Sequence, residues 1–177
     1  MNNMANRFLS VFLCFVSCSV AIADDVYIEK GRVGDIEIGM DVFSLIEEQS
    51  NKVTEVAVIR GGAEVAYAYQ FDQERTVILE TESDGTVWAI RIEGQSIKTR
   101  KSVGVGSLYE DVIAAYPDSK LNFGIEDGGY LSLFVPSLNG FFSFDIHSLD
   151  SALLEDEELP EEELEGRVVD VVVIHDL

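Results

Sequence analysis

Cysteine is scarce in this chain of 177 residues, and the position of its two cysteines matters more than their number. Both Cys14 and Cys18 lie within the first 23 residues, which have the layout of a secretory signal peptide. A short polar start is followed by an apolar stretch over 8–20 and by small residues at 21 and 23. Cleavage after Ala23 leaves a mature chain without a thiol, which excludes disulfides, a cysteine nucleophile and thiolate metal sites.

Long hydrophobic runs are missing as well. The apolar stretch over 8–20 is shorter than the roughly 20 residues that a membrane-spanning helix needs, and no cluster of charges follows it. We therefore expect residues 1–23 to be a signal peptide and the mature chain to be periplasmic or secreted, with a bacterial source as the default. A lipoprotein acylated at Cys18 is the less favoured alternative, because Phe15 stands where such leaders usually carry Leu.

Basic residues are few. The chain has 12 Lys and Arg against 33 Asp and Glu, for a formal net charge of −21, and the leader holds one of the cations and none of the acids. Nucleic acids and anionic lipid surfaces are poor partners for such a chain, because neutralising phosphate requires Lys and Arg. We expect the partner to be another exported protein, with a cationic one as an open option. The favoured interpretation of the acidity itself is that it keeps an exported protein soluble, and a charge-dependent partner is the alternative.

What the mature chain does contain is two similar units in tandem. Each opens with an apolar strand that ends in glycine, Ile36–Gly39 in the first and Val103–Gly106 in the second, and continues into a short helical pattern. Each closes on a turn and an apolar strand, over 84–90 and 165–171. Such fixed-order similarity is typical of a duplicated supersecondary unit. We predict a first repeat over 24–100 and a second over 101–177, which gains an acidic insert over 149–165.

Local signals place the two helices. Asp41 is the predicted N-cap of the first helix. Ser107 and Glu110 predict a capping box at the start of the second, which Pro117 ends. Helical spacing then predicts which side chains of the second helix share its core-facing side: Leu108, Val112, Ala115 and Tyr116.

Most of the remainder alternates between apolar and polar residues, which predicts strands. This alternation places Trp88 on the same face as Ile90 and Ile92. It also turns three valines of the last strand inward: Val169, Val171 and Val173. The predicted fold class is α+β, with two tandem repeats of a short helix plus an antiparallel meander sheet, and so with two sheets.

This arrangement resembles the tandem modules of the beta-lactamase-inhibitor-protein-like group, which includes the small BamE-type outer-membrane assembly lipoproteins. Two segments carry the resemblance: Ile38-Gly39-Met40-Asp41 with Leu45, and Val105-Gly106-Ser107 with Val112. The resemblance implies a binding or scaffold protein rather than an enzyme. It transfers no inhibitory residue to this chain.

No constellation of residues predicts catalysis. Ser143, Asp145 and His147 alternate along one strand, so their side chains point in parallel, whereas a working triad requires convergence. The acidic insert has continuous carboxylates interrupted by Pro160 and lacks the spacing of a calcium loop. We therefore expect no enzymatic activity, no cofactor and no bound metal.

Candidate contact residues remain. Tyrosine is enriched at protein interfaces, although in strands it more often fills the core. The candidate partner surface consists of Tyr67, Tyr69, Tyr130 and His147. A basic cluster of Lys98, Arg100 and Lys101 has two interpretations of equal weight: it pairs with the acidic insert, or it is scattered surface charge. The predicted function is an exported non-enzymatic protein-binding or inhibitor-like protein, and the alternative is a cell-envelope structural or assembly factor.

Overall fold

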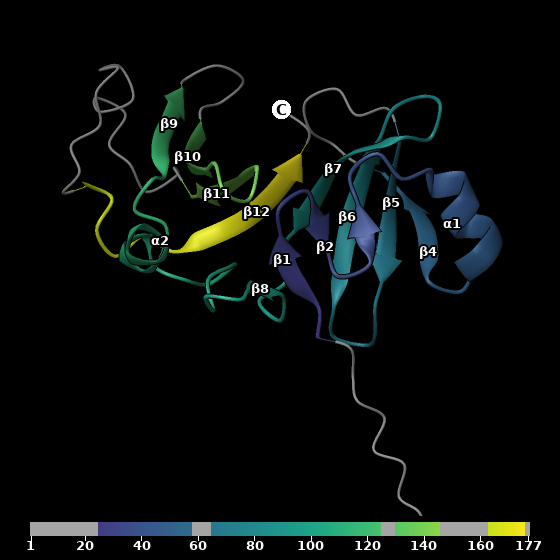
Figure 1. Ribbon diagram of the computed structural model, residues 1–177, viewed down its shortest axis with the longest axis horizontal. Coiled ribbons are helices and arrows are strands. Elements are labelled where there is room, and N and C mark those ends of the chain that lie inside the picture. The colour runs from purple at the N-terminus through teal and green to yellow at the C-terminus, as the bar shows by residue number, and fades with distance from the viewer. Residues whose placement is uncertain (1–24, 58–64, 125–129, 146–162, 176–177) are drawn as a thin grey trace, which may run out of the picture.

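The computed structural model describes residues 25–57, 65–124, 130–145 and 163–175. The predicted leader, His147 and the acidic insert up to residue 162 lie outside the described residues. Within them the chain forms two short helices, a four-stranded mixed sheet and an eight-stranded antiparallel sheet (Figure 1). The predicted α+β class is confirmed. None of the described helices is long and apolar enough to cross a membrane.

The larger sheet runs in the order β4-β5-β6-β7-β12-β11-β10-β9, and all its neighbouring strands are antiparallel. Its strands are β4 (Val53–Val56), β5 (Val65–Gln70), β6 (Thr76–Thr81), β7 (Val87–Ile92), β9 (Lys120–Gly124), β10 (Tyr130–Val135), β11 (Gly140–Phe144) and β12 (Val169–His175). Two runs of strands, β4–β7 and β9–β12, meet where β7 pairs with β12. The prediction of two separate sheets is wrong, because this pairing joins the runs into one.

The smaller sheet runs in the order β3-β2-β1-β8. Its strands are β1 (Tyr27–Glu29), β2 (Arg32–Val33), β3 (Ile36–Glu37) and β8 (Lys98–Thr99). The first three pair as antiparallel neighbours, whereas β1 and β8 pair in parallel, with Tyr27 opposite Lys98. Local sequence patterns do not predict this sheet, because its strands have only two or three residues each and its parallel pair joins distant segments.

A single hydrophobic core lies between the large sheet and a layer made by the helices and the small sheet. The helices are α1 (Val42–Gln49) and α2 (Tyr109–Ala115), and Figure 1 shows them toward opposite ends of the large sheet. An aromatic pair connects α2 with β11: the rings of Tyr109 and Phe144 pack with their centroids 5.9 Å apart. Burying an aliphatic or aromatic side chain stabilises a fold by about 1.5–3 kcal/mol, so this core is the main source of stability.

The start of α1 agrees with the prediction. Asp41 occupies the N-cap, and its carboxylate accepts hydrogen bonds from the amide of Phe43 and the hydroxyl of Ser44, each at 2.9 Å. The segment before the helix is also tied to the large sheet, because Val87 exchanges backbone hydrogen bonds with Gly39 and Met40. The helix therefore begins at a fixed point on β7.

The start of α2 differs from the prediction. Leu108 occupies the N-cap and is 41% exposed instead of facing the core. The capping box of Ser107 and Glu110 is wrong, because both side chains bind elsewhere. The Ser107 hydroxyl accepts from the amide of Gly104 (3.1 Å), and Glu110 accepts from the amide of Gly166 (2.7 Å). Glu110 thereby ties the first turn of α2 to the segment that leads into β12.

Two irregularities in the large sheet overturn part of the predicted alternation. Between β6 and β7, Glu80 lies opposite Ala89 and Thr81 opposite Val87, so Trp88 has no partner and bulges out. Trp88 is 36% exposed, whereas the prediction grouped it with the buried Ile90 and Ile92.

The second irregularity lies between β11 and β12, where Asp170 is skipped. Beyond it the side chains that face the core are those of Val172 and Ile174, both 0% exposed. Val169 belongs to the core as predicted. Val171 is buried but lies opposite Ser143 and outside the core cluster, and Val173 is only half-buried, so the predicted inward position of both is wrong. A bulge adds one residue to one strand and so reverses the faces of all that follow.

The two helix starts predict opposite effects of substitution at the N-cap. Replacing Asp41 with Ala should lower the free energy of unfolding by about 1 kcal/mol, because two hydrogen bonds to the first turn of α1 are lost. Replacing Leu108 with Ser should raise it by about 0.5–1 kcal/mol, because Ser caps α2 and Leu108 lies outside the core cluster. Urea unfolding monitored by circular dichroism measures both. Asp41→Asn is the matched control and should stay within about 0.5 kcal/mol of the parent chain.

Candidate functional site

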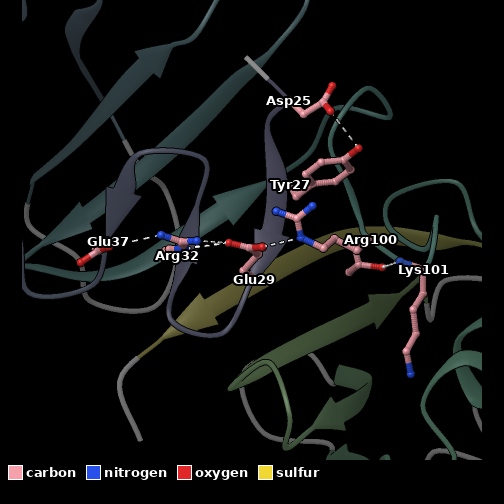
Figure 2. Close-up of polar contacts among 8 residues, drawn as sticks. Asp25, Tyr27, Glu29, Arg32, Glu37, Arg100 and Lys101 are labelled. Atoms are coloured by element: carbon pink, nitrogen blue, oxygen red, sulfur yellow. Dashed lines mark hydrogen bonds and ion pairs between the residues drawn. The ribbon is translucent and has the colours of Figure 1, made fainter. Parts of the chain in front are cut away.

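The densest group of charged contacts in the described residues joins β1, β2 and the end of β8 (Figure 2). At its centre Glu29 uses one carboxylate oxygen for each of two arginines. Its Oε2 accepts from Nε of Arg32, and its Oε1 accepts from Nε of Arg100, each at 2.7 Å. Arg100 is 71 positions away in the sequence. Hydrogen bonds from Arg100 and then from Arg32 hold the pKa of the Glu29 carboxyl below its usual value.

Aromatic and acidic side chains extend this group. The Arg100 guanidinium lies 4.5 Å from the centroid of the Tyr27 ring, a cation–π contact. The Tyr27 hydroxyl donates to Asp25 at 3.3 Å, and Arg32 also lies 3.7 Å from Glu37. The surface beside these residues is an open depression of about 420 Å³. Its lining residues are Asp25, Val26, Tyr27, Glu29, Arg32, Gly34, Asp35 and Arg100.

The chemistry of this depression is that of recognition. Three carboxylates and two guanidinium groups line it, so it offers hydrogen-bond donors and acceptors of both charges. Glu29 already neutralises part of the charge of both arginines. Its hydrogen bonds to Arg32 and Arg100 connect β1 to β2 and to the end of β8. Because these pairs are exposed, each contributes little to stability.

The other two members of the predicted basic cluster bind backbone carbonyl groups. Lys98 donates from Nζ to the carbonyl of Val105, and burial lowers the pKa of its ammonium. Lys101 donates to the carbonyl of Ala115 and lies 4.4 Å from the centroid of the Tyr116 ring. The predicted pairing of this cluster with the acidic insert concerns residues that lie mostly outside the described ranges.

Two of the four predicted surface residues lie in the core. Tyr67 is 7% exposed and Tyr69 is 0% exposed, so neither offers a surface to a partner in this conformation. The Tyr69 hydroxyl lies 2.9 Å from Oε1 of Gln49 and 3.4 Å from Asp35. Burial first, and then the charge of Asp35, raise the pKa of this phenol. Tyr69 therefore ties α1 and the β2–β3 turn to the large sheet.

The remaining predicted residues are only partly described. The backbone of Tyr130 begins β10, opposite Gly124, whereas its side chain and all of His147 lie outside the description. Ser143 is half-buried in β11, and Asp145 is exposed just after it. Within residues 25–57, 65–124, 130–145 and 163–175, no three His, Cys, Asp or Glu side chains are placed to hold a metal ion.

Sequence reasoning missed a set of exposed apolar side chains near the helix starts. Leu108 and Val168 are 41% and 48% exposed, and they are partners in an isolated antiparallel bridge. We refer to these two residues as the α2 corner. Phe43 and Trp88 are exposed in the other half, by 47% and 36%. Leucine at an N-cap is the one sequence signal that points to the α2 corner, because polar residues are preferred there.

The lowered pKa of Glu29 generates a prediction with a defined sign. The ionised form is favoured by folding, so its stabilising effect is full above the usual pKa of 4.5 and is lost as the pH falls through the folded value. The gap in unfolding free energy between the parent chain and Glu29→Gln should therefore narrow below pH 4.5. Urea unfolding between neutral and acidic pH measures it.

The control for this prediction is Arg100→Gln, which removes the hydrogen bond that lowers the pKa of Glu29 most. Nuclear magnetic resonance titration of the Glu29 carboxyl should show a higher pKa in that variant than in the parent chain. A parent Glu29 that titrates at or above 4.5 would contradict the assignment.

Tyr69 and Tyr67 form a matched pair for a second prediction. Tyr69→Phe should lower the free energy of unfolding by about 1 kcal/mol, because Gln49 loses its buried hydrogen-bond partner. Tyr67→Phe removes a hydroxyl for which no partner is found among the described residues, and should change stability by less than about 0.5 kcal/mol. Chemical denaturation of both variants tests the difference, and equal losses would refute it.

Comparisons with known proteins place the fold and nothing further. No protein-family model matches this chain, and no curated protein matches it. Among solved structures, the chain is similar to the crystal structure of the uncharacterized protein yfeY from Escherichia coli, with a TM-score of 0.54 and 13% sequence identity. The match covers 86% of this chain and 99% of that chain. At this identity the similarity shows a shared fold alone.

Proposed function

We propose that this chain is an exported, non-enzymatic protein-binding protein of inhibitor type. The observation that carries the proposal is the group of large apolar side chains left exposed on a strongly acidic surface. Leu108, Val168, Phe43, Leu121 and Trp88 are 36–48% exposed, whereas the other large apolar residues described are buried or half-buried. Adjoining exposed apolar groups rimmed by polar ones are typical of protein interaction sites, and Leu108 and Val168 adjoin in an antiparallel bridge.

The charge of the chain selects the kind of partner. A net charge of −21 accelerates encounters with cationic proteins and slows those with anionic ones. Association driven in this way weakens as salt screens the charges, with a screening length of about 8 Å at physiological ionic strength. The partner in this proposal is an exported cationic protein.

The proposed architecture behind this surface is a duplicated module. The hydrogen bonds at the two helix starts support it. Gly39 donates to the carbonyl of Val87, and Gly106 donates to that of Val169, each at 2.7 Å. Both glycines have a positive φ, of 87° and 84°, which only glycine adopts freely. The strand order also supports it, because each half of the large sheet adds its strands in chain order from an outer edge to the centre, β4 to β7 on one side and β9 to β12 on the other.

The second candidate function is a cell-envelope structural or assembly factor. Cys18 favours it, since acylation there would anchor the chain to a membrane. Resemblance to the beta-lactamase-inhibitor-protein-like group, with its outer-membrane assembly lipoproteins, is compatible with either candidate. Fractionation of the parent chain and a Cys18→Ala variant separates them, with a labelled lipid precursor as the readout. Membrane retention and labelling that require Cys18 would favour the second candidate.

The protein-binding proposal is tested by capture with the mature chain, residues 24–177. Immobilised on a support, it should retain a protein from the periplasmic fraction or the medium, and moderate salt should release that protein. An unrelated exported protein of similar size and negative charge is the control for unspecific ion exchange. If the two supports retain the same proteins, or if nothing is retained, the proposal fails.

A further inference from the structure

The α2 corner is an exposed apolar pair at the point where the last strand enters the large sheet. Leu108 and Val168 lie directly opposite each other in their bridge, so their side chains are neighbours. Val169, the next residue along the chain, is 1% exposed. The corner therefore lies on the outer side of a segment whose other side is in the core.

The fold does not require apolar residues at this position. At the start of α1 an equivalent bridge joins Asp41 and Thr86, which are both polar. Asp41 also caps its helix, whereas Leu108 offers α2 no side-chain cap. Leucine is among the least favoured N-cap residues. Residues that go against local sequence preferences, here the preference for a polar N-cap, occur mainly at functional sites.

Carboxylates border the α2 corner. The side chain of Asp111 accepts a hydrogen bond from the amide of Leu108 at 3.1 Å, so it is held beside the pair. Glu110 is held by its bond to the segment just before Val168. Asp170 is exposed two residues after Val168. The apolar pair thus has negative groups on both the helix side and the strand side.

The nearest cation in the sequence, Arg167, donates to backbone carbonyls, through Nε to Glu163 and through Nη1 to Asp145 at 2.9 Å. Its side chain is thereby committed to holding the approach to β12. A ligand at the corner meets an aliphatic surface with a negative border.

We propose that the α2 corner binds a basic amphipathic segment of a protein partner. An aliphatic or aromatic side chain of that segment packs on Leu108 and Val168, and flanking Lys or Arg side chains reach the border carboxylates. The inference rests on the proposed protein-binding function and adds the surface and the chemistry of the partner. The apolar contact sets the lifetime of the complex, and the border charges set the rate of encounter.

A synthetic probe tests the chemistry of the corner. The probe is a 14-residue peptide of Leu and Lys with helical periodicity, and its control replaces each Leu with Gln. With isotope-labelled mature chain, shifts in backbone resonances should concentrate at 107–112 and 165–170. The control peptide should bind about tenfold more weakly or worse, because burying two aliphatic side chains contributes at least that factor. Shifts spread evenly over all carboxylates, or equal binding of the two peptides, would overturn the proposal.

Matched variants separate the corner from general surface effects. The double variant Leu108→Ser with Val168→Thr removes the apolar pair, retains helix capping and keeps a β-branched residue in the bridge. It should lose about tenfold in peptide affinity while its melting temperature stays the same or rises. Ala114→Ser is the control, since Ala114 is exposed on α2 and is absent from the corner. Equal affinity losses in the two variants would refute the site.

Site-specific crosslinking in the native compartment distinguishes failure of this inference from failure of the proposed function. A photoreactive amino acid is placed at 108, 168 or 121 in the full chain. Crosslinks from 108 and 168 to a Lys- or Arg-rich segment, with none from 121, support the corner. Crosslinks only from 121 overturn the corner and leave protein binding intact. An absence of crosslinks from all three positions, together with an empty capture experiment, overturns both.

Discussion

The pairing of β7 with β12 is the constraint on which the rest of this structure depends. It places Ile90 opposite Ile174 and Ile92 opposite Val172, and all four side chains are fully buried. Without it the two runs of strands would be separate sheets, each with an open edge. The described residues contain no cysteine, so no disulfide supports this junction. Burial and backbone hydrogen bonds must therefore offset the chain entropy that is lost when the two halves come together.

Beside the junction, Glu80 and Arg91 form an ion pair with side chains only 5% and 16% exposed. A buried pair of this kind adds little net stability, and its main effect here is to favour one register of β6 against β7.

Those parts of the fold that depend on local chemistry could be predicted from the sequence. Asp41 caps α1 because an acidic residue stands directly before an apolar helical pattern, and that signal requires no distant contact. Strand positions follow from alternation for the same reason. The predictions fail where contact with a second, distant segment decides the local structure. Trp88 and Val173 were assigned to the wrong side because each lies at or beyond a bulge, and a bulge is a property of two paired strands. The parallel contact of β1 with β8 was missed because it joins short segments with no pattern of their own.

The candidate site was less predictable than the fold, and the reason is again physical. Glu29 and Arg100 are both ordinary surface residues in the sequence, and only the β1–β8 contact brings them within 2.7 Å. Tyr67 and Tyr69 lie in a strand as predicted, but both are buried, so their assignment to a partner surface shows that alternation alone does not identify a surface. An alternation of apolar and polar residues distinguishes the two faces of a strand, but it does not show which face is buried. Leu108 shows the opposite case. Its apolar character suggested the core, but an N-cap residue sits outside the helix, where its side chain points away from the packed face.

Stability and recognition are separated in space under the proposed function. The inward face of the large sheet, with the helices and the small sheet, holds the fold, whereas the apolar residues of the α2 corner lie outside the core cluster. This separation permits the corner to change without unfolding the chain, which a binding protein that must match its partner requires. The equivalent bridge of Asp41 and Thr86 shows that polar residues meet the same backbone requirement. In the proposed complex, Leu108 and Val168 contact an apolar side chain of the partner, and the negative border around them favours a partner surface that carries positive charge.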